Sequence, residues 1–142
     1  IISVNKMPST YSNYITECFK TSEKINYELE NFNGKVPNNR KYLESLPGVG
    51  RKTTNVVLSI LYNVPCIAVD THVARVSVRL GLAKKGDDVL AIERKLTRKL
   101  ERNRLNKLHH QLLLFGRYYC TARNPKCINC PFIKMCKEKH DF

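Results

Sequence analysis

Apolar and polar residues follow one another along most of the chain with the three- and four-residue spacing of amphipathic helices. Gly, Pro and Asn interrupt this pattern at intervals, as residues that end helices do. The pattern predicts helices over about 14–32, 40–46, 51–62, 70–81, 89–100 and 105–119. Strand signals are few, so the chain is predicted to be all-α.

Three of the predicted helices have a recognisable apolar face. In the helix over 70–81, Arg75 and Arg79 lie four residues apart and away from that face. The side chains that the pattern places in the core of these three helices are Val56, Val57, Ile60, Leu61, Val73, Val76, Leu80, Val89, Ile92, Leu96 and Leu100.

The length and composition suit a globular protein. With 142 residues, of which 42% are hydrophobic, the chain can form one domain or two small lobes. It has no apolar run near the roughly 20 residues that span a bilayer, and its N-terminus lacks the order of a secretory signal. We therefore expect a soluble intracellular protein without a membrane partner. Because the chain opens with Ile1, we expect a fragment or a trimmed form of a longer protein.

Positive charge is concentrated in the later two-thirds of the chain. The formal net charge is +13, yet residues 1–50 hold six basic and five acidic side chains, which nearly cancel. The predicted helix over 89–100 and its end carry a run of exposed basic residues. A basic surface of this kind favours a polyanionic partner such as nucleic acid, because neutralised phosphates release counterions. A well-solvated surface is the alternative interpretation.

Four cysteines cluster near the C-terminus with the spacing C-x6-C-x2-C-x5-C; they are Cys120, Cys127, Cys130 and Cys136. Four soft thiolates within 17 residues can surround one metal centre. Disulfides are rare in intracellular proteins. A structural zinc site is the competing interpretation, but it usually combines two close ligand pairs, and only Cys127 and Cys130 form such a pair here. Cys18 and Cys66 fit ordinary core positions.

A short turn joins the predicted helices over 40–46 and 51–62. Its sequence is Leu46-Pro47-Gly48-Val49-Gly50, in which two glycines allow a tight turn with a positive φ and bare backbone. The N–H groups of such a turn and of the helix that follows can hold a phosphate without reading the base sequence. A simple corner between two helices is the alternative.

Two residues near helix N-termini can carry chemistry. Lys52 lies in the first turn after this hairpin, where the positive end of the helix disfavours a second positive charge and favours a nucleophilic amine. Asp70 begins the helix over 70–81, where a carboxylate stays ionised and can stabilise positive charge on a sugar. Each also has an ordinary interpretation, a phosphate-binding or surface lysine and a plain N-cap.

Taken together, residues 46–53 (LPGVGRKT), 67–72 (IAVDTH), 115–118 (FGRY) and the four-cysteine tail closely resemble the endonuclease III family. The resemblance extends over about residues 34–140. It implies a helix-hairpin-helix glycosylase fold with two helical lobes on either side of a DNA-binding cleft. It places a partial lobe at 1–64, with the hairpin at about 40–59, and a second lobe at 65–142, with the cluster loop at 120–136.

The same resemblance implies an activity and its residues. A base-excision enzyme would remove oxidised pyrimidines from double-stranded DNA, acting as a monomer in the bacterial cytoplasm or another compartment that holds DNA. Lys52 would attack the sugar and form a Schiff base, β-elimination would cut the abasic site, and Asp70 would assist. A [4Fe–4S] cluster would support a basic loop in which Lys126 and Lys134 are candidate DNA contacts. The implied cluster ligands are Cys120, Cys127, Cys130 and Cys136, and the implied DNA-binding residues are Leu46, Gly48, Val49, Gly50 and Arg51.

The N-terminal third departs from the family pattern. We interpret the stretches that in the family fill the gap left by a flipped base as deleted or reduced to residues 9–13, and we expect an incomplete N-terminal lobe. Lyase activity alone, or DNA binding without catalysis, is therefore an alternative function. Related adenine glycosylases share the hairpin and the cluster but lack a lysine at the position of Lys52, which argues against that class.

Overall fold

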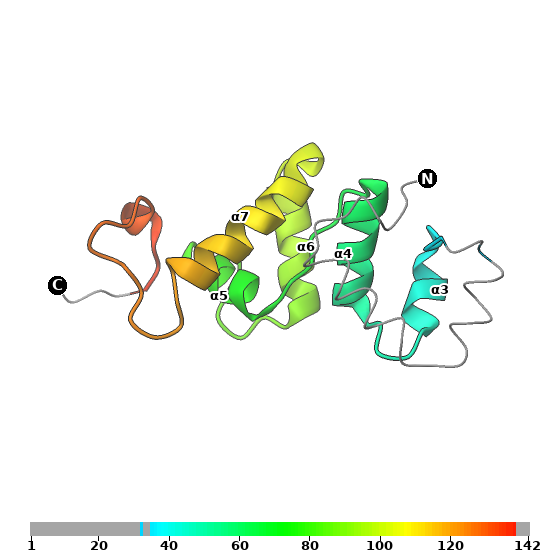
Figure 1. Cartoon of the computed structure of the whole chain (residues 1–142). Helices are drawn as coiled ribbons and strands as arrows, with labels where there is room; N and C mark the ends of the chain where they lie inside the picture. The colour runs from blue at the N-terminus through cyan, green and yellow to red at the C-terminus, as the bar shows by residue number, and fades with distance from the viewer. Residues whose placement is uncertain (1–31, 33–34, 139–142) are drawn as a thin grey trace. The chain divides into compact units, whose positions relative to one another are not determined.

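A computed structural model describes residues 32 and 35–138 and divides the chain into two compact units, residues 1–64 and 65–142 (Figure 1). All regular elements of the described residues are helices, which confirms the predicted all-α class. The helix predicted over 14–32, apart from its last residue, and the altered segment 9–13 lie outside the described residues. Within the described ranges, no helix has both the length and the apolar character needed to cross a membrane.

The described part of the first unit contains α3 (Arg40–Ser45) and α4 (Arg51–Tyr62), both within the predicted ranges. The Asn39 side chain caps α3 by accepting a hydrogen bond from the Tyr42 N–H at 3.1 Å. Asn63 ends α4 in the left-handed conformation, with φ of 52°, which asparagine tolerates better than most residues. Local signals in the sequence therefore set the start of α3 and the end of α4.

The buried face of α4 differs from the predicted one. Val57 and Leu61 are buried as expected, but Leu58 is buried with them, whereas Val56 and Ile60 are only half-buried. Several polar residues of α4 are also buried, and a pattern that assigns polar residues to the surface cannot find this face. These buried polar residues are Thr53, Thr54, Asn55 and Ser59.

Asn55 shows why a polar side chain can lie inside this unit. Its side chain is buried, and its Oδ1 accepts a hydrogen bond from Nη2 of Arg40 at 2.7 Å. Arg40 also pairs with Glu44 at 3.0 Å along α3. A buried amide needs such a partner, and this one links α3 to α4 directly, so it helps to fix the geometry of the hairpin between them.

The described part of the second unit contains three α-helices and two short 3-10 helices. Their bounds are α5 (Thr71–Arg79), α6 (Val89–Lys99), η2 (Arg102–Arg104), α7 (Leu105–Tyr118) and η3 (Ile133–Met135). In Figure 1, α7 lies across α5, and α6 packs against α5 as well. The core between them consists of Ile67, Val69, Val73, Ala83, Ile92 and Leu96.

One residue of the predicted core in this unit is at the surface. Val89 is 53% exposed, whereas Ile92 and Leu96 of the same stripe are buried. Val89 is the first residue of α6, and helical side chains tilt toward the N-terminus. Its side chain therefore points past the end of the helix, and the apolar stripe begins one turn later than predicted.

Gly116 allows α7 to approach α5 closely. A Cβ atom at Gly116 would lie 2.9 Å from Cγ2 of Val76 and 3.1 Å from the carbonyl oxygen of His72. We expect Gly116→Ala to lower the free energy of unfolding by about 1–2 kcal/mol. The free-energy cost of the steric overlap exceeds the free energy gained from the higher helix propensity of alanine. Chemical denaturation measures this difference. Gln111→Ala, at an exposed position of α7, is the matched control; an equal stability of the two variants would contradict the steric argument.

Candidate functional site

The predicted hairpin turn forms as the sequence indicated. The Val49 N–H donates to the Leu46 carbonyl at 3.1 Å, and Gly48 has φ of +77°, so Pro47 and Gly48 occupy the central positions of a type II turn. The side chains of Leu46 and Val49 are buried, while Gly48 and Gly50 are exposed. Leu46 and Val49 therefore anchor the turn and leave its backbone to face a ligand.

The N-cap residue of α4 is a glycine, which has no side chain that could cap the helix. Gly50 is the N-cap residue and makes no side-chain hydrogen bond, whereas Asp70 and Asp88 cap α5 and α6 with their carboxylates. Uncapped N–H groups at the positive end of a helix attract anions such as phosphate. Arg51 and Lys52 occupy the first turn of α4 and are both exposed, so this end of the helix presents two cations beside its N–H groups.

Asp70 is the N-cap residue of α5, which agrees with the simpler interpretation of its position in the sequence. Its Oδ1 accepts a hydrogen bond from the Val73 N–H at 2.7 Å, and the residue is half-buried. The segment 67–69 before it is fully buried and fixes the start of α5. The cap uses one carboxylate oxygen, and an ionised carboxylate can accept further hydrogen bonds. Lys52 lies in the first unit and Asp70 in the second.

The four clustered cysteines face one cavity in the second unit. Leu80, Phe115, Phe132, Ile133 and Arg79 complete its lining. No disulfide links any of these four thiols. Among the described residues, no three His, Cys, Asp or Glu side chains converge in a way that could hold a metal ion. Four thiols that line one apolar cavity are a soft ligand set that suits an iron–sulfur cluster or a zinc ion.

Short backbone hydrogen bonds place the cysteines around this cavity. The Cys120 N–H donates to the Phe115 carbonyl at 2.7 Å, directly after α7 ends. The Cys130 N–H donates to the Cys127 carbonyl at 3.0 Å, so these two residues share one tight turn. Desolvation, followed by the neighbouring thiols, raises the pKa of the Cys127 thiol above its ordinary value. A metal that binds there must displace this proton.

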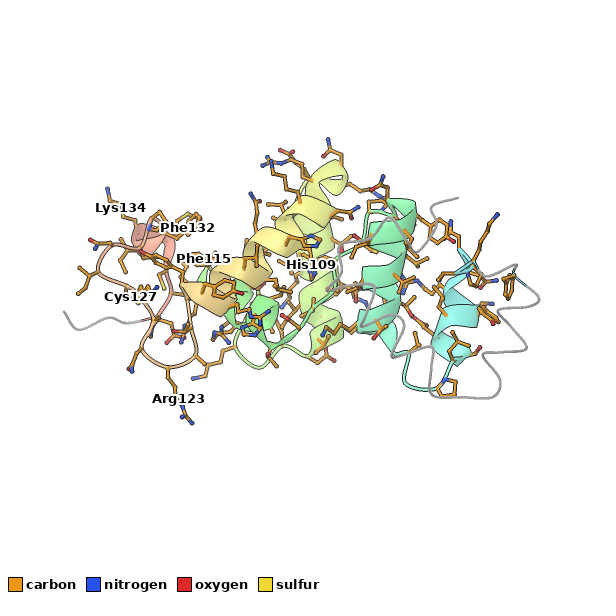
Figure 2. The ribbon with its side chains drawn as sticks, viewed as in Figure 1. His109, Phe115, Arg123, Cys127, Phe132 and Lys134 are labelled. Carbon is orange, nitrogen blue, oxygen red and sulfur yellow. The ribbon has the colours of Figure 1, made fainter. Side chains whose placement is uncertain are left out.

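Aromatic rings shield one side of the cavity. The rings of Phe115 and Phe132 meet edge to face with centroids 5.3 Å apart, and Tyr119 stacks on Phe115 at the same distance. Figure 2 shows Phe115 and Phe132 close to Cys127, at the end of α7. An apolar shell of this kind limits the access of water to a bound cluster.

Two arginines of α5 reach the first cysteine, although the sequence offered no sign of this beyond their spacing. Arg75 donates from Nε to the Cys120 carbonyl at 3.1 Å and from Nη2 to the Gly116 carbonyl at 2.6 Å. Arg79 donates from Nη1 to the Thr121 carbonyl at 2.7 Å and to Sγ of Cys120 at 3.3 Å. These contacts connect residues more than 40 positions apart, so no local pattern could predict them.

The outer surface of the cysteine loop is basic. Lys126 and Lys134, the predicted contact residues, are exposed, and so is Arg123. In Figure 2 the side chains of Arg123 and Lys134 extend away from the loop. The loop thus combines an apolar, thiol-lined inner side with an outer side that carries these cations together with the exposed side chains of Ile128 and Met135.

Two family models match the regions that carry this geometry. Residues 31–60 match the helix-hairpin-helix motif, and residues 120–136 match the iron-sulfur binding domain of endonuclease III. The second match covers the segment from the first to the last clustered cysteine. It confirms the predicted iron–sulfur cofactor, a [4Fe–4S] cluster, and the zinc alternative is set aside.

Curated relatives and solved structures agree with these matches. Endonuclease III of Bacillus subtilis (strain 168) is 47% identical over 128 residues, which are 90% of this chain and 57% of the relative. Endonuclease III of Rickettsia prowazekii (strain Madrid E) is 49% identical over 109 residues, 77% of this chain and 51% of the relative. The chain therefore spans about half the length of the curated relatives it matches.

The structural neighbours show the same fold. A trapped endonuclease III–DNA covalent intermediate superposes with a TM-score of 0.74 at 45% identity, over 80% of this chain and 53% of that one. A thermostable thymine-DNA glycosylase superposes with a TM-score of 0.71 over 94% of this chain and 67% of that one; at 24% identity it supports the fold alone. The hairpin, the four-cysteine loop and these similarities agree: over the part that it shares with them, the chain is a homologue of endonuclease III, with a helix-hairpin-helix motif and an iron–sulfur binding domain.

Proposed function

We propose that the chain is a base-excision DNA glycosylase with AP-lyase activity. It acts as a monomer on double-stranded DNA that contains oxidised pyrimidines or abasic sites, in the bacterial cytoplasm or another DNA-containing compartment. The observation that carries this proposal is the position of Lys52, an exposed amine in the first turn of α4, directly after the type II turn of the helix-hairpin-helix. Residues 1–64 act as a partial hairpin lobe, and 65–142 as the lobe with the cluster loop.

The hairpin binds the DNA backbone in this proposal. Its exposed glycines let a phosphate approach the N–H groups at the start of α4, and Arg51 adds a charge-assisted contact. The buried side chains of Leu46 and Val49 hold the turn in place. These contacts do not read bases, so the hairpin fixes the register of the protein on the duplex and leaves lesion recognition to other residues.

Lys52 acts as the nucleophile. Its neutral Nζ attacks the anomeric carbon of the sugar, and the base leaves with the electron pair of the glycosidic bond. Loss of a proton from nitrogen and opening of the ring give an imine. Removal of a proton from the neighbouring carbon then expels the 3′ phosphate by β-elimination, which cuts the strand. The Asp70 carboxylate stabilises positive charge that develops on the sugar and helps to accept the proton from Lys52.

The cluster shapes the second unit. We assign its ligands to the four thiols that line the cavity: Cys120, Cys127, Cys130 and Cys136. When bound, the cluster supplies four strong metal–thiolate bonds that hold the loop together. The loop then presents Arg123, Lys126 and Lys134 toward the phosphates of the duplex.

Borohydride trapping tests the proposed reaction. The purified chain with its cluster is mixed with a duplex that contains one abasic site, or one oxidised pyrimidine, and sodium borohydride is added. Hydride reduces the imine to a stable secondary amine, so an active enzyme gives a covalent protein–DNA band. Nicking of the abasic duplex without borohydride reports β-elimination.

The two substrates separate the competing functions. An adduct with both duplexes supports the complete glycosylase and lyase. An adduct with the abasic duplex alone means that the chain is a lyase without base removal. Salt-dependent binding with neither an adduct nor a nick would contradict catalysis and favour a DNA-binding iron–sulfur module.

A further inference from the structure

Arg79 holds both ends of the cysteine loop. Its Nη1 donates to the Thr121 carbonyl at 2.7 Å, directly after the first clustered cysteine. Its own carbonyl accepts a hydrogen bond from the Lys137 N–H at 2.7 Å, directly after the last one, Cys136. One residue at the end of α5 thus closes a loop that contains all four thiols.

The same guanidinium contacts a thiol. Nη1 of Arg79 lies 3.3 Å from Sγ of Cys120, and Arg79 lines the cavity together with the four cysteines. Arginine stays protonated in proteins and presents several donors in a rigid plane. When Cys120 is a thiolate, this contact is a hydrogen bond from a cation to an anionic sulfur.

We propose that Arg79 is a positioning residue for the iron–sulfur cluster: it closes the ligand loop and polarises the sulfur of Cys120. This inference rests on the proposed set of four ligands. Hydrogen bonds to sulfur and nearby charge are among the factors that set the potential of such clusters. Reduction adds one electron to the cluster and its thiolates, and the Arg79 charge stabilises this more negative state. Arg79 therefore raises the reduction potential and slows loss of iron.

Arg75 provides a matched control on the same helix. It lies one turn earlier in α5 and also contacts Cys120, but through the carbonyl oxygen, with its second bond to the Gly116 carbonyl. Neither of these contacts involves sulfur. Arg75→Gln removes a cation, two backbone contacts near the cluster and the 3.2 Å contact with Nδ1 of His72, and it keeps the N–H to sulfur contact of Arg79.

The test compares the cluster-loaded full chain with Arg79→Gln, Arg79→Lys and Arg75→Gln. Voltammetry gives the reduction potential, with the electrode supplying the electron, and the decay of visible absorbance in an iron chelator gives the rate of cluster loss. We expect Arg79→Gln to lose its cluster about tenfold faster than the wild type, as removal of an outer contact to a metal ligand does. Its potential should fall, Arg79→Lys should lie between the two, and Arg75→Gln should lower the potential much less, because it keeps the N–H to sulfur contact of Arg79.

The outcomes separate this inference from the assignment of the ligands. Two results would overturn the role of Arg79: an unchanged reduction potential in Arg79→Gln, or a fall in Arg75→Gln as large as the fall in Arg79→Gln. Neither result would affect the ligand assignment if the wild-type chain contains iron and sulfide. If Arg79→Gln does not fold, Arg79→Lys is the test, because lysine keeps the charge but lacks the planar donors. A reduction potential below that of the wild type supports the role of Arg79, and an unchanged potential overturns it. A wild-type chain that lacks iron and sulfide would overturn the ligand assignment and the inference with it.

Discussion

Lys52→Gln is expected to abolish the borohydride-trapped adduct with abasic DNA. Glutamine has a similar helix propensity and nearly the same length, so α4 should keep its structure. Its amide nitrogen is not nucleophilic and cannot form an imine. Nicking of the abasic duplex should fall at least about 100-fold, equivalent to roughly 2.7 kcal/mol in the activation free energy. Denaturing electrophoresis of a labelled duplex measures both the adduct and the nick.

A second exposed lysine in the same unit provides the control. Lys41 lies on α3 and is exposed like Lys52, but it is outside the hairpin turn and the N-terminus of α4. We expect Lys41→Gln to form the adduct at the wild-type rate, apart from a small loss of binding at low salt. An undiminished adduct in Lys52→Gln would show that another amine is the nucleophile and would overturn the assignment of Lys52.

The ends of the helices could be predicted because local contacts set them. Asn39, Asp70 and Asp88 each accept a hydrogen bond from an N–H three residues later, so the cap and its helix are read together in the sequence. The type II turn at Pro47 and Gly48 is equally local, since it depends on the fixed φ of proline and the positive φ of glycine. The pattern could therefore place α3 to α7 within one or two residues.

The contacts that support the site could not be predicted in the same way. Arg79 and Cys120 are 41 positions apart, and Gly116 meets Val76 across a similar separation. Such pairs depend on how α7 crosses α5, which no helical periodicity specifies. The sequence indicates the residue types that the chemistry needs, because those types are few. It does not indicate the residues that hold them in place, because almost any long side chain could fill that role.

Asp70→Asn is expected to reduce base release about 100- to 1000-fold while the fold is kept. Asparagine caps helices about as well as aspartate, so the hydrogen bond to the Val73 N–H survives. Loss of the negative charge at the positive end of α5 should cost only about 0.3–1 kcal/mol of stability. The amide cannot accept a proton or balance charge on the sugar. Single-turnover release of an oxidised pyrimidine measures the rate, and thermal unfolding measures the stability.

Asp88→Asn isolates the chemical role from the structural one. Asp88 caps α6 through a hydrogen bond from the Ala91 N–H at 2.6 Å, as Asp70 caps α5, so the two substitutions make the same chemical change at the same position of a helix in the same unit. We expect both variants to unfold at nearly the same temperature, because each loses the same interaction with a helix dipole. Only Asp70→Asn should lose activity. Equal rates for the two variants would mean that Asp70 is an N-cap and no more, and the carboxylate of this reaction would have to come from another part of the chain.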